Sequence, residues 1–490
     1  YETIENICDK CSCSTPTIVN DDAGGEAGTI VEDGYFLLDC TQKKLQHLLA
    51  DWPSSFGKNH TGREFVFSMS GNDIHRLQQL PKTDALLLFS CRHCKLSDIE
   101  SAVFVDTPNI IRLDLSWNHL NGDVLRADIF RGRYNENEYE PIALEELDLT
   151  HNSIQTLDRN MFEHTPNLRW LSLAHNPLDM SNELTESAIA SIKNMEHLDL
   201  SYTNLTNLPD NLIKNMPHLR ELLLHGNLLA KVPESLALVG KGLRSLYLGE
   251  NPITEFTDEN FLGLNQVAHL NISGMLELEA VLPGTFSHLN SLEVLICHRN
   301  PKLRRFDIDS LRGLKSLREL DISHNALTTF ESDVDEFNLT TINNENKDFS
   351  NLHSLKLEGN PWNCECNLYK TLLLLENYEI GHFHSDDEAR CSNPYDLSGT
   401  LLTDLVLLPL CSTYTRKPLK IPIYEAPPFL RPRSLILSVL SVTVVIVIGV
   451  LIGFTIVCVK KKLRKTEFGF TSPVRYSTVR NSTTSSVIQA

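Results

Sequence analysis

Residues 219–229 read LRELLLHGNLL, and this stretch decides the fold. Leucine occupies its first, fourth, sixth and eleventh positions, and asparagine occupies the ninth. The spacing of the fourth and sixth positions predicts a short strand whose leucines point inward and whose fifth residue points outward. The asparagine falls where the chain turns, and a buried side-chain amide there can bond the backbone groups of an adjacent turn.

The same eleven-residue frame recurs along the chain. Clear copies are LEELDLTHNSI (144–154), LRWLSLAHNPL (168–178), LRSLYLGENPI (243–253) and LRELDISHNAL (317–327). Weaker copies fill the gaps, and the ninth position is held in turn by Asn72, Cys94, Asn118, Asn152, Asn176, Thr203, Asn227, Asn251, Met275, Asn300, Asn325 and Asn360. Two longer steps, from Asn118 to Asn152 and from Asn325 to Asn360, hold polar inserts that we expect to be surface loops.

These repeats resemble the leucine-rich-repeat family over residues 64–360. The resemblance implies an α/β solenoid, a curved parallel β-sheet horseshoe of about 12 repeats. Such a stack needs caps, because its terminal repeats would otherwise expose apolar faces and strand edges. NPWNCECNL (360–368) and the cysteines near the N-terminus resemble the cysteine-rich caps of extracellular members, so we expect caps over 1–63 and 361–412.

The cap cysteines are expected to form disulfides. Cys364 and Cys366 are one residue apart, too close to pair easily with each other. The family resemblance implies the following pairs: Cys8–Cys13, Cys11–Cys40, Cys364–Cys391 and Cys366–Cys411. A four-cysteine zinc site is the alternative for each cluster, but neither cluster offers two pairs at the usual ligand spacing.

Four further cysteines lie outside the caps. Cys91 and Cys297 fall on the inward sixth position and Cys94 replaces the turn asparagine, so we expect reduced core thiols. A Cys91–Cys94 bridge is the alternative. Cys458 is a palmitoylation candidate, with an ordinary membrane residue as the alternative.

One apolar run predicts a transmembrane helix. Residues 434–459 contain no charge, and at about 1.5 Å per residue they exceed the roughly 30 Å hydrocarbon core of a bilayer. The run is followed by KKKLRK (460–465), which places the tail, 460–490, in the cytosol and the N-terminus outside the plasma membrane. The five prolines of 413–433 predict a stalk. Because the chain begins with Tyr1, we expect a mature form whose targeting segment has been removed.

The charge is strongly asymmetric about this helix. The net charge is −19, and residues 434–490 carry seven basic residues and one acidic one, so residues 1–433 carry −25. A surface this acidic argues against nucleic acid as a partner.

No motif in the chain predicts catalysis or a cofactor. G-x-S-x-G, H-E-x-x-H and P-loop patterns are absent from the sequence. The acidic and imidazole groups of HFHSDDEARC (382–391) could hold a metal, but a solvated polar face explains them better. The tail is too short for a kinase or a TIR domain, so signalling would need cytosolic adaptors. We therefore expect a binding protein and not an enzyme.

The outward positions of the strands suggest where a partner binds. Large aromatics on a rigid sheet commonly form binding hot spots. The predicted partner-binding residues, with His175 beside them, are Trp117, His151, Trp170, Tyr202, Leu223, His225 and Tyr247. The alternative is that histidine before the asparagine is ordinary filler in this family, as is aspartate between the leucines.

Short motifs predict modifications. Glycosylation sequons occur at Asn59, Asn204, Asn271 and Asn338, and a glycan on Asn271 would obstruct the concave face. Tail signals comprise the endocytic pattern at Tyr476, a proline-directed phosphorylation site at Ser472 and the terminal VIQA, a weak PDZ ligand.

The whole architecture resembles single-pass extracellular leucine-rich-repeat receptors and adhesion proteins of the tartan and capricious type, with Toll-like ectodomains more distant. That resemblance implies cell-surface recognition or adhesion, in which the concave face binds an extracellular protein, possibly a second copy on an apposed cell. The alternative is a receptor or co-receptor for a soluble ligand, including innate immune recognition.

Overall fold

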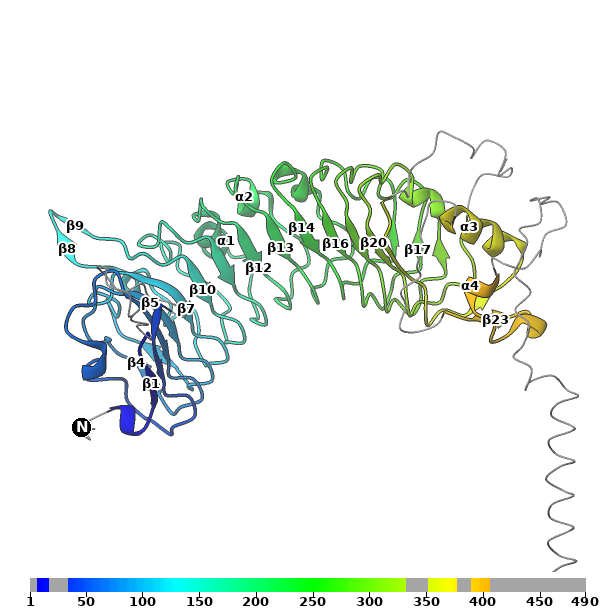
Figure 1. The fold of residues 1–490 in the computed structure, drawn as a ribbon. Coiled ribbons are helices and arrows are strands. Elements are labelled where there is room, and N and C mark those ends of the chain that lie inside the picture. The colour runs from blue at the N-terminus through cyan, green and yellow to red at the C-terminus, as the bar shows by residue number, and fades with distance from the viewer. Residues whose placement is uncertain (1–6, 17–33, 332–350, 377–388, 406–490) are drawn as a thin grey trace, which may run out of the picture. The chain divides into compact units, whose positions relative to one another are not determined.

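The computed structural model describes residues 7–16, 34–331, 351–376 and 389–405. One sheet of 14 strands runs through this part of the chain, and all neighbours except β1 and β2 pair in parallel (Figure 1). Its strands, in spatial order, are β1 (Ser12–Ser14), β2 (Tyr35–Asp39), β3 (Glu64–Ser68), β5 (Leu86–Ser90), β7 (Ile110–Asp114), β10 (Glu146–Asp148), β11 (Trp170–Ser172), β12 (His197–Asp199), β13 (Glu221–Leu223), β14 (Ser245–Tyr247), β16 (His269–Asn271), β18 (Val294–Ile296), β20 (Glu319–Asp321) and β21 (Ser354–Lys356). The leucine-rich-repeat solenoid is therefore confirmed.

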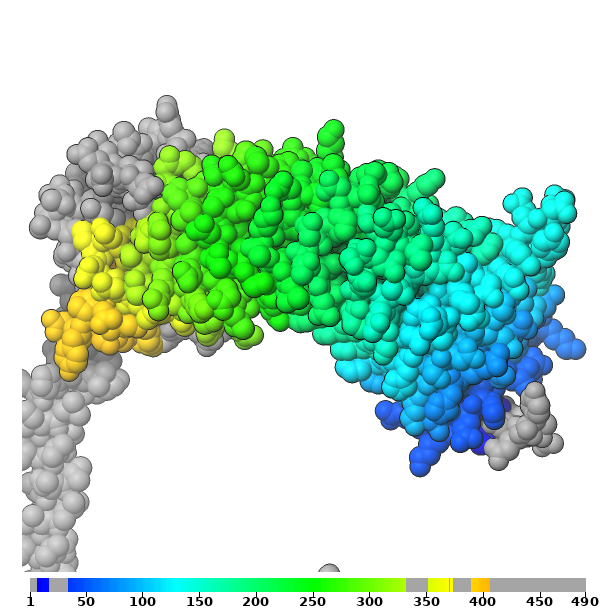
Figure 2. Space-filling view, turned by 180° about the vertical axis from the view of Figure 1, so that it is seen from behind, coloured from blue at the N-terminus to red at the C-terminus, as the bar shows by residue number. Residues whose placement is uncertain are grey.

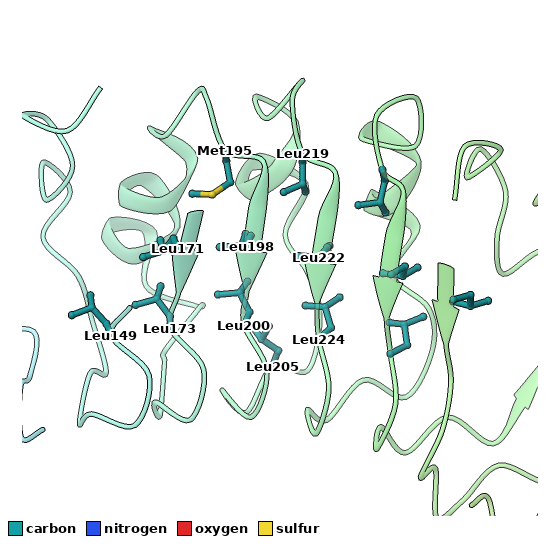
Figure 3. Close-up of a cluster of buried hydrophobic side chains, with 14 of the residues drawn as sticks. Leu149, Leu171, Leu173, Met195, Leu198, Leu200, Leu205, Leu219, Leu222 and Leu224 are labelled. Atoms are coloured by element: carbon teal, nitrogen blue, oxygen red, sulfur yellow. The ribbon is translucent and has the colours of Figure 1, made fainter. Parts of the chain in front are cut away.

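The leucines build the core as the repeat predicts. Leu222 and Leu224 are fully buried, while Leu223 between them is half-buried and points away from the core. Figure 3 shows the leucines of successive strands aligned in rows, with Leu171, Leu198 and Leu222 in one of them. Residues that point out of the sheet on the other side form what we call the open face.

The asparagine ladder works as expected. Asn227 accepts hydrogen bonds from the backbone N–H groups of Thr203 and Leu205, both at 3.0 Å, and donates to the carbonyls of Leu200 and Leu224 at 2.9 and 3.1 Å. Each such side chain ties its own turn to the preceding one, which satisfies buried backbone groups that no strand reaches.

The N-terminal cap supplies an extra turn of the solenoid. β2 lies within residues 1–63 yet pairs in parallel with β3, so the sheet has thirteen parallel strands where about twelve repeats were expected. β1 then pairs antiparallel with β2 at the edge of the sheet, and the Cys8–Cys13 and Cys11–Cys40 disulfides hold this end together. Because these four cysteines are oxidised, the zinc alternative fails here.

The C-terminal cap closes the other end. Trp362 is fully buried and donates its indole N–H to the carbonyl of Leu357 at 2.8 Å. Cys364 pairs with Cys391, as the family resemblance implies, and Cys366 is also disulfide-bonded. Cys411, the partner expected for Cys366, lies outside the described residues.

The expectation of reduced thiols at Cys91 and Cys94 is wrong. The two form a disulfide with Cα atoms 5.6 Å apart, a separation that suits the bond. The turn between the sixth and ninth positions brings the two side chains together. The alternative, a Cys91–Cys94 bridge, is therefore the one observed. Cys297 is a free, buried cysteine, as expected.

The remaining elements are short. The helices are α1 (Glu183–Ala190), α2 (Asp210–Ile213), α3 (Cys366–Glu376) and α4 (Leu402–Leu405), with 3-10 turns η1 (Ile7–Asp9), η2 (Ser54–Phe56), η3 (Ala127–Ile129), η4 (Glu234–Leu238), η5 (Ile308–Leu311) and η6 (Tyr395–Leu397). Two of the small sheets have two strands: β4 (Arg76–Leu77) with β6 (Asp98–Ile99), and β22 (Trp362–Asn363) with β23 (Cys391–Asn393). A third has three strands in the order β15 (Glu255–Phe256), β17 (Ala280–Val281) and β19 (Arg305–Phe306).

The first polar insert forms a projecting hairpin, not an irregular loop. β8 (Tyr134–Asn135) and β9 (Glu138–Tyr139) pair antiparallel, and this hairpin stands out from the surface in the ribbon and in the space-filling view (Figures 1 and 2). The second insert falls mostly within 332–350, outside the described residues.

No helix among the described residues is long and apolar enough to cross a bilayer. The predicted transmembrane run 434–459, the stalk, Cys458 and the tail signals at Ser472 and Tyr476 all lie outside the described residues.

Candidate functional site

The eighth position of the repeat has an unusual backbone. In every repeat from the cap to residue 359, this residue has a positive φ, including 58° at Trp117 and 54° at His151. Such a conformation is uncommon for residues other than glycine. Because it recurs in register, successive side chains at this position leave the backbone in the same direction.

Five of these side chains form a continuous stack, which we call the ring ladder. Its members are His93, Trp117, His151, His175 and Tyr202. The ring centroids are 4.8 Å apart for His93 and Trp117, 3.6 Å for Trp117 and His151, 3.9 Å for His151 and His175, and 4.2 Å for His175 and Tyr202. Neighbouring strands in a sheet lie about 4.8 Å apart, so one ring from each repeat stacks with little adjustment.

A glycine ends the ladder. Gly226 holds the eighth position after Tyr202, and a Cβ there would lie 2.0 Å from the Tyr202 ring. The Tyr202 hydroxyl reaches past this glycine and donates to the Glu250 carboxylate at 2.8 Å. Burial, reinforced by Glu250, raises the pKa of Tyr202 to about 12.

The ladder disfavours protonation of His151. Burial lowers the pKa of His151, and the neighbouring His175, Arg92 and His93 lower it further. The guanidinium of Arg92 lies 5.9 Å from the centroid of the Trp117 ring. Trp117 itself is 39% exposed, so the ladder offers aromatic edges to a partner.

Two further ring pairs lie elsewhere on the face. Trp170 stacks on His197 with centroids 4.9 Å apart, and His197 Nδ1 lies 2.7 Å from a Glu221 carboxylate oxygen. Burial and the nearby Glu221 raise the pKa of Tyr247, whose ring lies 5.5 Å from that of His225. Burial lowers the pKa of His225 as well.

The predicted partner-binding residues therefore divide into two groups. Trp117, His151 and Tyr202 are members of the ring ladder, together with His175. Trp170 belongs to the Trp170–His197 pair, and His225 and Tyr247 form the other pair. Leu223 is half-buried on β13, in register with Tyr247.

Sequence reasoning missed four residues of this face: His93, His197, Glu221 and Glu250. Their signal was available, because His93 and Glu250 hold the eighth position of the frame, and His197 and Glu221 hold the third.

The described sequons lie in different environments. Asn59 and Asn204 are exposed. Asn271 is half-buried on the open face, and its side-chain carbonyl accepts hydrogen bonds from the Ser273 N–H at 3.0 Å and from the Ser273 hydroxyl at 2.5 Å. Asn338 and the polar cluster His382, His384, Asp386 and Asp387 lie outside the described residues. Within the described ranges, no group of three or more histidine, cysteine and acidic side chains could hold a metal ion.

A family model matches part of the chain. The leucine rich repeat model matches residues 140–178, 241–302 and 275–327. These matches agree with the leucine-rich-repeat fold described above. The chain is similar to the curated proteins Tsukushi of Gallus gallus, 32% identical over 46% of this chain, and lumican of Gallus gallus, 28% identical over 44%. Toll-like receptor 9 of Homo sapiens is 28% identical over 54% of the chain.

These leucine-rich-repeat matches are partial. The chain covers 57% of Tsukushi, 60% of lumican and 25% of Toll-like receptor 9. Among solved structures, a chain of the Drosophila Toll–Spatzle complex matches with a TM-score of 0.45 and 19% identity, over 68% of this chain and 45% of that one.

Proposed function

We propose that this chain is a cell-surface recognition or adhesion receptor that binds an extracellular protein through its open face, with the ring ladder at the centre of the contact. The observation that carries the proposal is the ladder itself. Five rings stand in register on one rigid sheet, and Trp117, the second of them, remains exposed. Preformed aromatic surfaces of this kind lose little conformational entropy on binding and supply much of the affinity of protein interfaces.

The surface location rests on two features of the chain. The uncharged run 434–459 would anchor it as a type I plasma membrane protein, and disulfides at both ends suit an oxidising compartment. Glycans at Asn59, Asn204, Asn271 and Asn338 would suit the same location. A glycan on Asn271 would shift the contact toward strands before β16.

The test is a cell-aggregation experiment with the full-length protein in non-adhesive cells. Trp117→Ala with His151→Ala removes two adjacent rings of the ladder, and Trp170→Ala separately removes the Trp170–His197 stack. Tyr395→Ala, which removes an aromatic side chain that is 91% exposed in the C-terminal cap, is the matched control. Surface display of every variant is measured by antibody staining.

Each result bears on a different part of the proposal. If the ladder variant loses clustering and the Tyr395 variant keeps it, the result supports adhesion between identical copies through the ladder. Clustering that survives in the well-displayed ladder and Trp170 variants would overturn the open face as the adhesive site. If the unsubstituted protein is displayed but does not cluster, a different partner is implied, and a receptor or co-receptor for a soluble ligand, including an innate immune one, becomes the better reading.

A further inference from the structure

The open face carries an unbalanced charge between β7 and β14. At the third, fifth, seventh and eighth positions of these six repeats, Arg112 is the single Lys or Arg side chain. The carboxylates at the same positions are Asp114, Glu146, Asp148, Asp199, Glu221 and Glu250. Arg112 pairs with Glu146 at 2.5 Å, and the His197 ring bonds Glu221. Negative charge therefore remains in excess on this surface.

Three of these carboxylates, Asp114, Asp148 and Asp199, form what we call the aspartate row. Each holds the fifth position of its repeat and accepts a hydrogen bond from the backbone N–H two residues later, at 2.9, 2.8 and 2.9 Å respectively. The backbone thus fixes their orientation. Within the described part of the chain, no Lys, Arg or His nitrogen lies within 4.0 Å of any of the three, as an ion pair would require.

The surroundings of Asp148 disfavour its charged form. Burial raises its pKa, hydrogen bonds from Thr150 oppose the shift, and the neighbouring Asp114 adds to it, while Arg92 acts from farther away to lower it. A carboxylate held charged in such surroundings gains from any cation that reaches it.

Aromatic side chains flank the aspartate row. The fifth position lies between the third and the eighth, so the row runs between the Trp170–His197 pair and the ring ladder. Cations bind favourably to aromatic rings and to carboxylates alike. The chain's own Arg92 already lies against Trp117 in this way.

We propose that the partner segment that docks on the open face between β7 and β14 is basic, with arginine or lysine side chains lying over the aspartate row between the ring ladder and Trp170. This inference rests on the proposed function and names the chemistry of its partner. An acidic segment would meet the excess carboxylates and be repelled.

The test measures binding of two labelled peptides to the purified full chain in 150 mM NaCl. The probes are Ac-(Arg-Ser)4-amide and Ac-(Glu-Ser)4-amide. The variant Asp114→Asn with Asp148→Asn removes two charges from the row while keeping an acceptor for the backbone N–H. The control Asp321→Asn removes the same kind of charge from the same repeat position, but Asp321 already has Lys356 Nζ at 3.7 Å.

We expect the basic peptide to bind the unsubstituted chain and the acidic one not to bind. The row variant should lose at least fivefold in affinity, and the Asp321 variant less than twofold. An equal loss per charge removed in both variants would overturn the proposal, because it would mean that only total charge matters. No loss in the row variant, or a preference for the acidic peptide, would overturn it as well.

A folding measurement separates binding from structural damage. Because burial disfavours the Asp148 carboxylate, Asp148→Asn alone should leave thermal stability unchanged or raise it. The same substitution should weaken binding of the basic peptide. If the ladder variants lose clustering but the row variant changes neither clustering nor peptide binding, the proposed function stands and this inference fails. If the ladder variants still cluster, the proposed function itself fails.

Discussion

The two halves of the open face share one backbone and differ in their chemistry. From β7 to β14 and from β16 to β21, buried leucines, turn asparagines and a positive φ at the eighth position recur alike. In the first half the eighth positions carry the ring ladder. In the second half they carry Gly274, Arg299, His324 and Gly359, among which no ring stacking is found in the described residues.

The charges of the two halves differ as well. In the second half, Lys356 pairs with Glu319 at 2.8 Å and lies 3.7 Å from Asp321, so neighbouring groups neutralise one another. In the first half the aspartate row has no such partner among the described residues. Inward positions therefore preserve the fold in both halves, while outward positions are free to differ. The half with unpaired charge and stacked rings is the one we propose for binding.

The largest expected effect tests what the halves share. Asn227→Ala in the first half and Asn325→Ala in the second each leave buried backbone groups without partners, and at about 1–3 kcal/mol per orphaned group we expect losses of about 4 kcal/mol in each. Urea unfolding of the full chain gives the total, and peptide-resolved hydrogen exchange locates the loss. A loss confined to one half would show that the asparagine ladder is not a shared element.

The next effect belongs to the first half alone. Gly226→Ala places a side chain at a φ of +59° and against the Tyr202 ring, so we expect a loss of about 2–3 kcal/mol and displacement of the ladder's last ring. Gly313→Ala is the control, because Gly313 also has a positive φ, but a Cβ there would meet nothing within 4 Å. Similar losses at the two glycines would mean that backbone strain alone matters and that Tyr202 moves freely.

A smaller effect concerns the ladder's middle ring. His151→Ala removes ring contacts with Trp117 at 3.6 Å and with His175 at 3.9 Å, and at about 0.5–1.5 kcal/mol per ring pair we expect a loss of about 1 kcal/mol and a changed near-UV signal from Trp117. His324 holds the same repeat position in the second half, and His324→Ala should lower the free energy of unfolding by less. If both substitutions cost the same, stacking contributes nothing beyond the shared backbone.

The sequence was enough to predict the sheet and the turn asparagines, because each depends on a local pattern of leucine or asparagine. The cap disulfides that lie in the described residues followed from the family resemblance, since cysteine spacing alone allows several pairings. The ring ladder was only partly predicted. Trp117 and Tyr202 were chosen for their size, but the stack depends on a backbone conformation that repeats at the eighth position, and residue types do not reveal that conformation. His93 was missed for this reason. The Cys91–Cys94 bridge depended on the distance across one turn, which spacing alone left open.

The smallest expected difference between the halves is in their response to acid. Burial lowers the pKa of His151 and of His225 in the first half, and it lowers the pKa of His298 in the second half, where Asp321 opposes the shift. A histidine whose pKa is lowered by folding binds fewer protons in the folded state than in the unfolded state, so stability falls as pH drops below about 6.5. We expect hydrogen exchange at pH 5.5, corrected for the intrinsic rate, to show a greater loss of protection in the first half than in the second.

Two double variants decide whether His151 and His225 cause this loss. His151→Asn with His225→Asn should reduce the acid sensitivity of the first half, because the groups that gain protons on unfolding are gone. His218→Asn with His288→Asn changes two exposed histidines and should leave it unchanged. Equal acid sensitivity in both variants would mean that these two imidazoles do not set the pH response. Asp148 could not replace them, because burial raises its pKa and its protonation at low pH favours the folded state.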